Sequence, residues 1–98
     1  MRDLPRRATV VKVDDASTFV IRPNMAVKLA GIQAPPKGTE ESRRAKAELE
    51  RLLLRKKVEF ETREWDRLGR SIAFVRIDGV DVNKAMEEFL ESLESESP

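Results

Sequence analysis

The chain has 98 residues, of which 40% are hydrophobic and 38% are charged, and it contains no cysteine, histidine or tyrosine. This length and composition indicate one globular domain, and the missing side chains exclude zinc, haem and thiol chemistry. Any catalysis must therefore use Asp, Glu, Arg, Lys, Ser or Thr, with a hard cation such as calcium or magnesium where a metal is needed.

The net charge of +1 conceals an uneven distribution along the chain. All 19 Lys and Arg residues lie at or before Lys84, and five of the 18 acidic residues follow it. A basic body attracts an anionic polymer unless the acidic end folds over it, and an ordinary solvated surface explains the pattern equally well. Many Lys, Arg and Glu residues without Cys are also typical of thermophilic proteins. We find no targeting signal and no membrane-spanning run, which favours a cytoplasmic protein without membrane partners.

The first third of the chain predicts three short strands. Residues 8–14 are β-branched and alternate, "DDAS" is typical of a turn, and "PN" ends the next strand. The three predicted strands cover residues 8–14, 18–22 and 25–32. In the third strand, Lys28 lies on the face opposite Val27 and Leu29.

A helix is predicted to follow, because Thr39 is a good N-cap and the charges at residues 40–41 and 55–57 suit the helix dipole. Its apolar stripe is Ala45, Leu49, Leu52 and Leu53. Two more strands are predicted at residues 58–62 and 71–77, joined by the turn "WDRLGR". The "DG" at 78–79 is a hairpin signal, after which Asp81 or Asn83 caps a second helix. The apolar positions of this helix are Val82, Ala85 or Met86, Phe89 and Leu93, and "ESLESESP" is expected to fray.

The element order β-β-β-α-β-β-α predicts a mainly β (α+β) fold. Five strands with a helix between the third and fourth are typical of a five-stranded Greek-key OB-fold barrel, here with a C-terminal helix. A ferredoxin-like fold is less suitable, because it requires a helix after the first strand. We expect a single domain over residues 1–98, with a core at about 8–93 and an acidic tail at 94–98.

Four fragments in order resemble one known family. "VDDASTFVI" is similar to V-x-D-G-D-T-x-x-V, "VKLAGIQAPP" to R-L-x-G-I-D-A-P-E and "DRLGR" to D-x-x-G-R, and "DGVDVNKAM" resembles the strand-to-helix passage that follows. Together they resemble the staphylococcal nuclease-like (thermonuclease) family from about Ala8 to Met86. The resemblance implies an OB-fold and calcium-dependent hydrolysis of phosphodiester bonds in DNA and RNA.

The resemblance also implies where the chemistry should lie, and most of it is missing. Ser17 and Gln33 stand at the positions of the two calcium-binding aspartates, and Pro36 stands at the position of the glutamate that acts on water. Lys28 replaces the first arginine, and Arg70 retains the second. A one-residue gap in "DDAST" would instead place Asp15 at the first ligand position. We therefore expect a degenerate active site, a pseudo-enzyme without a metal cofactor.

The remaining basic and aromatic residues predict a binding surface. The candidate residues for phosphate or nucleic-acid binding are Lys28, Trp65, Arg67 and Arg70. Trp65 is placed to stack on a base, although packing against the barrel is the interpretation we favour from the sequence. Pro35-Pro36 is either a peptide-recognition element or, as favoured here, a rigid end to the third strand.

Three functions remain open at the level of the sequence. The first is a non-catalytic binding module for single-stranded nucleic acid or a protein. The second is a residual calcium-dependent nuclease with unorthodox ligands, for which the candidates are Asp15, Glu41 and Asp66. The third is a structural subunit that forms a homo-oligomer through its C-terminal helix.

Overall fold

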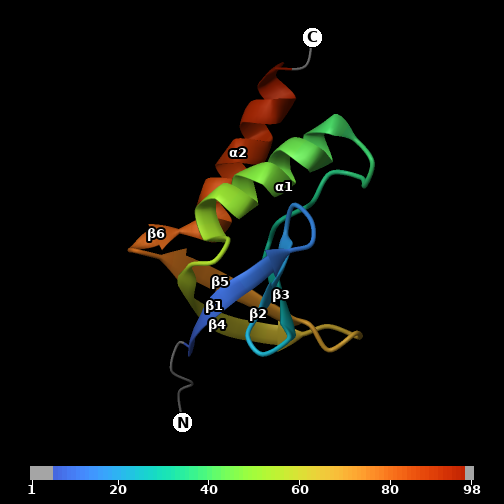
Figure 1. Ribbon diagram of the computed structural model, residues 1–98. Helices are drawn as coiled ribbons and strands as arrows, with labels where there is room; N and C mark the ends of the chain where they lie inside the picture. Colours follow the sequence, from blue (N-terminus) through green and yellow to red (C-terminus); the bar gives the residue numbers. More distant parts are fainter. Residues whose placement is uncertain (1–5, 97–98) are drawn as a thin grey trace.

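The computed structural model describes residues 6–96 and shows a β-barrel with two helices packed over one of its ends (Figure 1). The strands are β1 Arg6–Val13, β2 Thr18–Ile21, β3 Met25–Leu29, β4 Lys57–Trp65, β5 Ser71–Ile77 and β6 Val80–Asp81. The helices are α1 Glu40–Leu53, between β3 and β4, and α2 Val82–Glu96, after β6.

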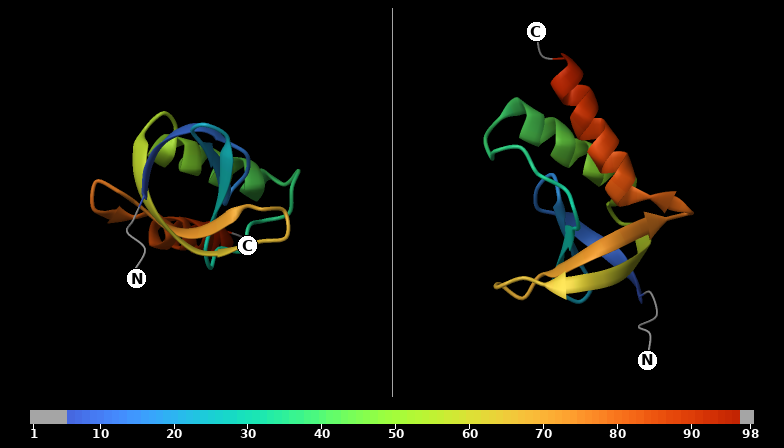
Figure 2. Two further views of the ribbon diagram at one scale, coloured as in Figure 1. Left: turned by 90° about the horizontal axis from the view of Figure 1, so that it is seen from below. Right: turned by 180° about the vertical axis from the view of Figure 1, so that it is seen from behind.

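Five of the strands close into a ring. They are ordered β3-β2-β1-β4-β5, with antiparallel neighbours, and β3 pairs with β5 in parallel, so that Lys28 lies opposite Ile72. Figure 2 (left) looks along this ring from below. The two-residue β6 extends the sheet beyond β5. The structure thus confirms the predicted mainly β fold, a five-stranded closed barrel consistent with an OB-fold, with one helix between strands three and four and one at the C-terminal end.

The inward-facing positions of the strands form the core. In β5, Ala73, Val75 and Ile77 are buried, whereas Phe74 and Arg76 between them are exposed. This alternation is that of a strand with one buried face, and the bounds of β5 agree with the predicted 71–77 to the residue.

Helix α1 covers one end of the barrel. The Thr39 hydroxyl accepts a hydrogen bond from the Ser42 N–H at 3.1 Å, which confirms the predicted N-cap. The stripe of Ala45, Leu49 and Leu53 is fully buried in the barrel core. Leu52 lies at the edge of this stripe and is only partly buried.

Helix α2 begins at Val82, and the carboxylate of the preceding Asp81 accepts a hydrogen bond from the Lys84 N–H at 3.0 Å, as expected of a cap. Met86 rather than Ala85 is its buried residue at that turn. The segment predicted to fray is helical as far as Glu96, because Leu93 is 4% exposed and anchors the last turns. Residues 97 and 98 of the predicted tail lie outside the described residues. No helix among the described residues is long and apolar enough to span a membrane.

Asn83, the second candidate cap, instead connects α2 to the barrel. It is 8% exposed, and its Oδ1 accepts a hydrogen bond from the Val75 N–H at 2.8 Å. Its Nδ2 donates to the carbonyl oxygens of Ala30 at 2.9 Å and Ala73 at 3.1 Å. One amide side chain therefore ties the start of α2 to β5 and to the residue that follows β3.

Three strand ends differ from the predictions by two or three residues, and three others differ by one. β1 begins at Arg6 rather than at residue 8, and β3 ends at Leu29 rather than at residue 32, because Gly31 adopts φ of +75° and turns the chain. β4 continues to Trp65, past a register shift between Thr62 and Glu64. Such a bulge breaks the two-residue period of buried and exposed side chains. The strand predicted from that period therefore ended at residue 62, three residues too early.

Candidate functional site

Lys28 and Arg70, the two basic family positions, meet where β3 and β5 run side by side. Lys28 is half-buried, on the face of β3 opposite the buried Val27 and Leu29, as predicted. It lies opposite Ile72 of β5, and Arg70 stands two residues before Ile72. The parallel pairing therefore brings Lys28 on β3 near Arg70, the residue immediately before β5, although the two are far apart in sequence. We call this part of the surface the β3–β5 seam.

Ser17 lies beside the end of β3. Its carbonyl accepts a hydrogen bond from the Leu29 N–H at 2.8 Å. Its own N–H donates to Asp15 Oδ1 at 2.9 Å, and its hydroxyl lies 3.4 Å from the same oxygen. The first calcium position is thus a buried hydroxyl, and the nearby carboxylate of Asp15 holds the β1–β2 turn in place.

Gln33 and Pro36 lie in the segment between β3 and α1. Both are exposed, and with Glu41 they line a groove that faces the C-terminal part of α2. The carbonyl of Pro36 accepts a hydrogen bond from the Thr39 hydroxyl at 2.7 Å. At the position that the resemblance assigns to the family's glutamate, this chain therefore has a residue that leads the backbone into the helix cap.

These residues do not fit a calcium ion. Calcium takes six to eight oxygen ligands and depends on carboxylates, whereas Ser17 and Gln33 are neutral and Pro36 has no side-chain oxygen. The alternative ligands stand in three different elements, namely Asp15 in the β1–β2 turn, Glu41 in the first turn of α1 and Asp66 in the β4–β5 turn. Within residues 6–96, no three His, Cys, Asp or Glu side chains are grouped so that they could hold a metal ion.

Asp66 organises the turn between β4 and β5. Its Oδ1 accepts hydrogen bonds from the N–H groups of Leu68 and Arg70, both at 2.9 Å. Its Oδ2 accepts a bond of 2.6 Å from Arg70 Nε. The backbone N–H of Arg70 is the main cause that lowers the pKa of Asp66. The charge of Arg70, retained from the family, is therefore balanced within its own turn.

Trp65 is 55% exposed at the end of β4, so it is partly covered and still presents about half of its surface to solvent. Arg67 is exposed in the adjacent turn, where Leu68 is 78% exposed. Trp65 also lines a hollow of about 380 Å³, whose charged lining residues have both signs, namely Arg6, Glu61, Arg63 and Glu64. This hairpin tip, defined here as Trp65 to Arg70, carries the exposed Trp65 and Arg67 and lies at the end of the barrel away from the helices (Figure 1).

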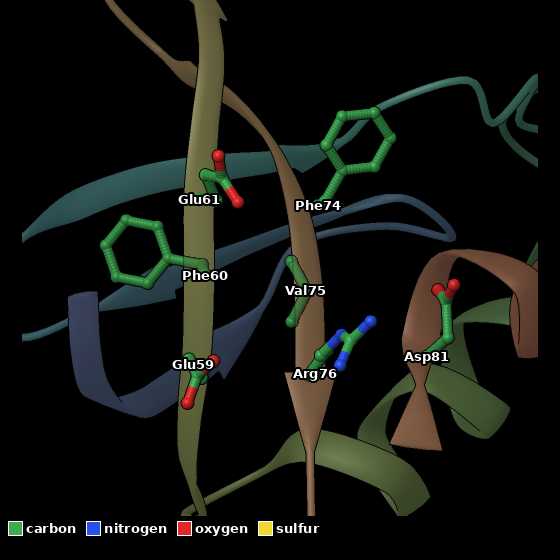
Figure 3. A pocket seen from close by; sticks show the side chains of 7 residues that line it. All are labelled: Glu59, Phe60, Glu61, Phe74, Val75, Arg76 and Asp81. Carbon is green, nitrogen blue, oxygen red and sulfur yellow. The ribbon is translucent and has the colours of Figure 1, made fainter. Parts of the chain in front are cut away.

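A second hollow, of about 460 Å³, lies on the outer face of β4 and β5 and was missed from the sequence. Figure 3 shows Phe74 and Arg76 on β5, Glu61 on β4 and Asp81 on the neighbouring β6. The Phe74 ring is exposed, with the guanidinium carbon of Arg63 6.0 Å from its centroid. The sequence does contain a sign of this hollow, because the large apolar residue Phe74 falls on an outward-facing position of an alternating strand. The lining charges have both signs, so this hollow selects no ligand class.

Comparisons with known proteins bear on the family. The chain matches the family model described as Staphylococcal nuclease homologue over residues 26–88, more than half of its length. The match begins in β3 and ends in α2, so it includes Lys28, Gln33, Pro36 and Arg70. No curated protein matched the chain. The chain belongs to the family of staphylococcal nuclease homologues.

Proposed function

We propose that this domain is a non-catalytic module that binds single-stranded nucleic acid. The observation that carries the proposal is the exposed indole of Trp65, which stands next to the exposed Arg67 at the hairpin tip. Stacking of a base on an aromatic side chain contributes about 1–3 kcal/mol, and a guanidinium group binds phosphate oxygens. Both interactions are available at one end of the barrel.

The loss of catalysis follows from the side chains at the family positions. Calcium-dependent hydrolysis needs carboxylates for the cation, an acid that acts on water, and cations that stabilise the developing charge. A hydroxyl at Ser17, an amide at Gln33 and a proline at Pro36 perform neither of the first two tasks. Because the loss of one such group commonly lowers the rate by about 10²–10³, the bound strand stays intact.

The path of the strand runs from the hairpin tip along the β3–β5 seam. Lys28 and Arg67 supply its uncompensated charge, since neither forms an ion pair with another described residue, whereas Arg70 is paired with Asp66. Two phosphate contacts correspond to a slope of roughly −1.4 in a plot of log affinity against log salt concentration. Binding is therefore weak and sensitive to salt.

Trp65 also supplies the assay, because it is the only tryptophan and the chain has no tyrosine. An oligo(dT) titration at low salt should quench its fluorescence, and added salt should reverse the quenching. In a parallel anisotropy titration with labelled oligo(dT), Trp65→Ala should lower the affinity roughly 5- to 100-fold. Arg67→Ala should lower it and make the salt dependence shallower.

Arg43→Ala is the matched control, because Arg43 is an exposed arginine on α1, far along the chain from the tip. It changes the net charge as Arg67→Ala does and should leave the affinity unchanged. If Trp65→Ala retains the wild-type affinity, or if both arginine variants lose the same amount, the hairpin tip is not the binding surface.

A further inference from the structure

A groove separates the segment between β3 and α1 from the end of α2. Its volume is about 510 Å³, and its apolar walls are Ala34, Pro35, Pro36, Leu90 and Leu93. Both walls lie at the helical end of the molecule, as Figure 2 (right) shows for the β3–α1 segment and α2. It lies where the family resemblance places the second calcium ligand and the catalytic acid, at Gln33 and Pro36.

The groove is largely pre-formed. Leu93 is buried in its floor and Leu90 is half-buried beside it. The opposite wall contains two consecutive prolines, whose φ angles are fixed near −65°, and the Pro36 carbonyl is held by the Thr39 hydroxyl at 2.7 Å. A ligand that enters a pre-formed groove orders few side chains, so a short apolar segment retains more of its binding energy.

Both charged residues that line the groove are acidic, although the exposed Lys37 follows Pro36 directly in the chain. Glu41 and Glu94 are its only charged lining residues, and neither has an ion-pair partner among residues 6–96. Further exposed acids on α2 lie close by in sequence, namely Glu87, Glu88 and Glu91. Such an edge repels phosphate groups and attracts Lys and Arg. The groove is therefore unsuited to nucleic acid, unlike the hairpin tip at the other end of the molecule (Figure 1).

We infer that this groove binds a segment of a partner protein in which an apolar anchor is flanked by basic residues. The anchor packs between Pro36 and Leu90, and the flanking cations lie against Glu41 and Glu94. Charge complementarity selects this occupant over an acidic segment, and the small size of the contact places the complex in the weak, reversible class. The inference goes beyond nucleic-acid binding and uses none of the residues assigned to it.

Fluorescence anisotropy with the full chain tests the inference. The probes are three labelled peptides that share a leucine-rich centre and carry Lys/Arg, Ser or Glu flanks. Affinity should fall in that order. Glu41→Gln and Glu94→Gln should each weaken the basic peptide about two- to fivefold and leave the Ser-flanked peptide unchanged. Equal affinities for the three peptides, or no binding at all, would overturn the inference.

A blocking variant tests the location. Ala34 is an exposed wall residue, so Ala34→Arg fills the groove with a like charge and should lower the affinity of the basic peptide at least tenfold. Ala47→Arg adds the same side chain at an exposed position on α1 and should change nothing. Equal losses in both variants, or none in Ala34→Arg, would place the peptide elsewhere.

Two further occupants are distinguished by the same variants. The hairpin tip of a second copy also combines an exposed apolar residue, Leu68, with a basic one, Arg67. Concentration-dependent association in sedimentation experiments that Ala34→Arg abolishes would show that a second copy fills the groove, against the inference. Displacement of the Ser-flanked peptide by oligo(dT), which has no charge-based attraction for that peptide, would assign the groove to nucleic acid and would likewise overturn the inference.

Discussion

Replacement of Asn83 by alanine should destabilise the fold more than any other single loss of a polar side chain in the described residues. This amide makes three hydrogen bonds at 2.8, 2.9 and 3.1 Å, and it is almost fully buried. In Asn83→Ala, the Val75 N–H and the Ala30 carbonyl lose this partner in the interior. α2 then loses these hydrogen bonds to the barrel wall, and only the apolar packing of residues such as Val82 and Met86 holds it there.

The size of the effect can be worked out from these bonds. A hydrogen bond contributes about 1 kcal/mol net, and a buried donor left without a partner costs about 1–3 kcal/mol. For three bonds and one abandoned buried donor, Val75 N–H, we expect the free energy of unfolding to fall by about 4–6 kcal/mol. That is a large share of the 5–15 kcal/mol typical of a whole domain.

Asn83→Asp separates the roles of the two side-chain atoms. The aspartate still accepts from Val75, but an oxygen replaces the amide nitrogen that donates to Ala30 and Ala73. Burial and the two facing carbonyls raise the pKa of this carboxyl in the folded state. The variant should therefore be most stable below the unfolded pKa of about 3.9 and lose stability as pH rises through the higher folded value.

Urea denaturation followed by circular dichroism measures both variants, because the exposed Trp65 is a poor probe of the core. The isosteric Asn83→Asp keeps the side-chain volume, so it controls for a cavity. A loss below about 0.5 kcal/mol in Asn83→Ala, or an Asn83→Asp variant with the pH profile of the wild type, would refute the reasoning, since surface changes have effects of that size.

Three further outcomes are expected. Leu49→Ala, in the fully buried stripe of α1, should cost about 2–5 kcal/mol in the same denaturation assay, whereas Leu68→Ala at the hairpin tip should stay within about 0.5 kcal/mol; similar losses would contradict the assigned burial. The lowered pKa of Asp66 gives stability that is present above the unfolded pKa of about 3.9 and is lost as pH falls through the folded pKa. Asp66→Asn should therefore flatten the acid side of a plot of Tm against pH. An unchanged slope would contradict the hydrogen bonds assigned to Asp66 in this turn. Single-stranded DNA should be cleaved no faster with calcium than with EDTA, in the wild type as in Arg70→Ala; calcium-dependent cleavage by the wild type would show that the site is still catalytic.

The fold could be predicted because its signals are local. The cap at Thr39 and the alternation in β5 depend on residues within one or two turns or strand positions of each other. The end of β4 could not be predicted, because the register shift after Thr62 depends on how β5 pairs with it. Trp65 consequently looked like part of a turn, although it belongs to the strand.

The sequence predicts the candidate site residues as one group, whereas the structure places them at several separate locations on the surface. Lys28 and Arg70 meet only because β3 and β5 pair, and the pairing of Arg70 with Asp66 depends on the geometry of the turn. The role of Asn83 was hidden, because two of its partners, Ala30 and Ala73, are reached only through the closed barrel. The sequence did single out Pro35-Pro36, but only the opposing helix makes that pair one wall of a groove.

The β3–β5 seam has a consequence for how the barrel opens. Its pairing extends over only three residue pairs, from Val27–Ser71 to Leu29–Ala73, and it joins segments that are separated in the chain by α1 and β4. Contacts between segments that are distant in the chain form late and open early. The Ala30 N–H donates to the Ala73 carbonyl at 2.9 Å, at the end of this short pairing. Its native-state hydrogen exchange should therefore be faster than that of amides inside the longer β4–β5 ladder. A nucleic-acid strand bound along the seam would hold the two edges together, and protection at Ala30 would then rise with ligand concentration.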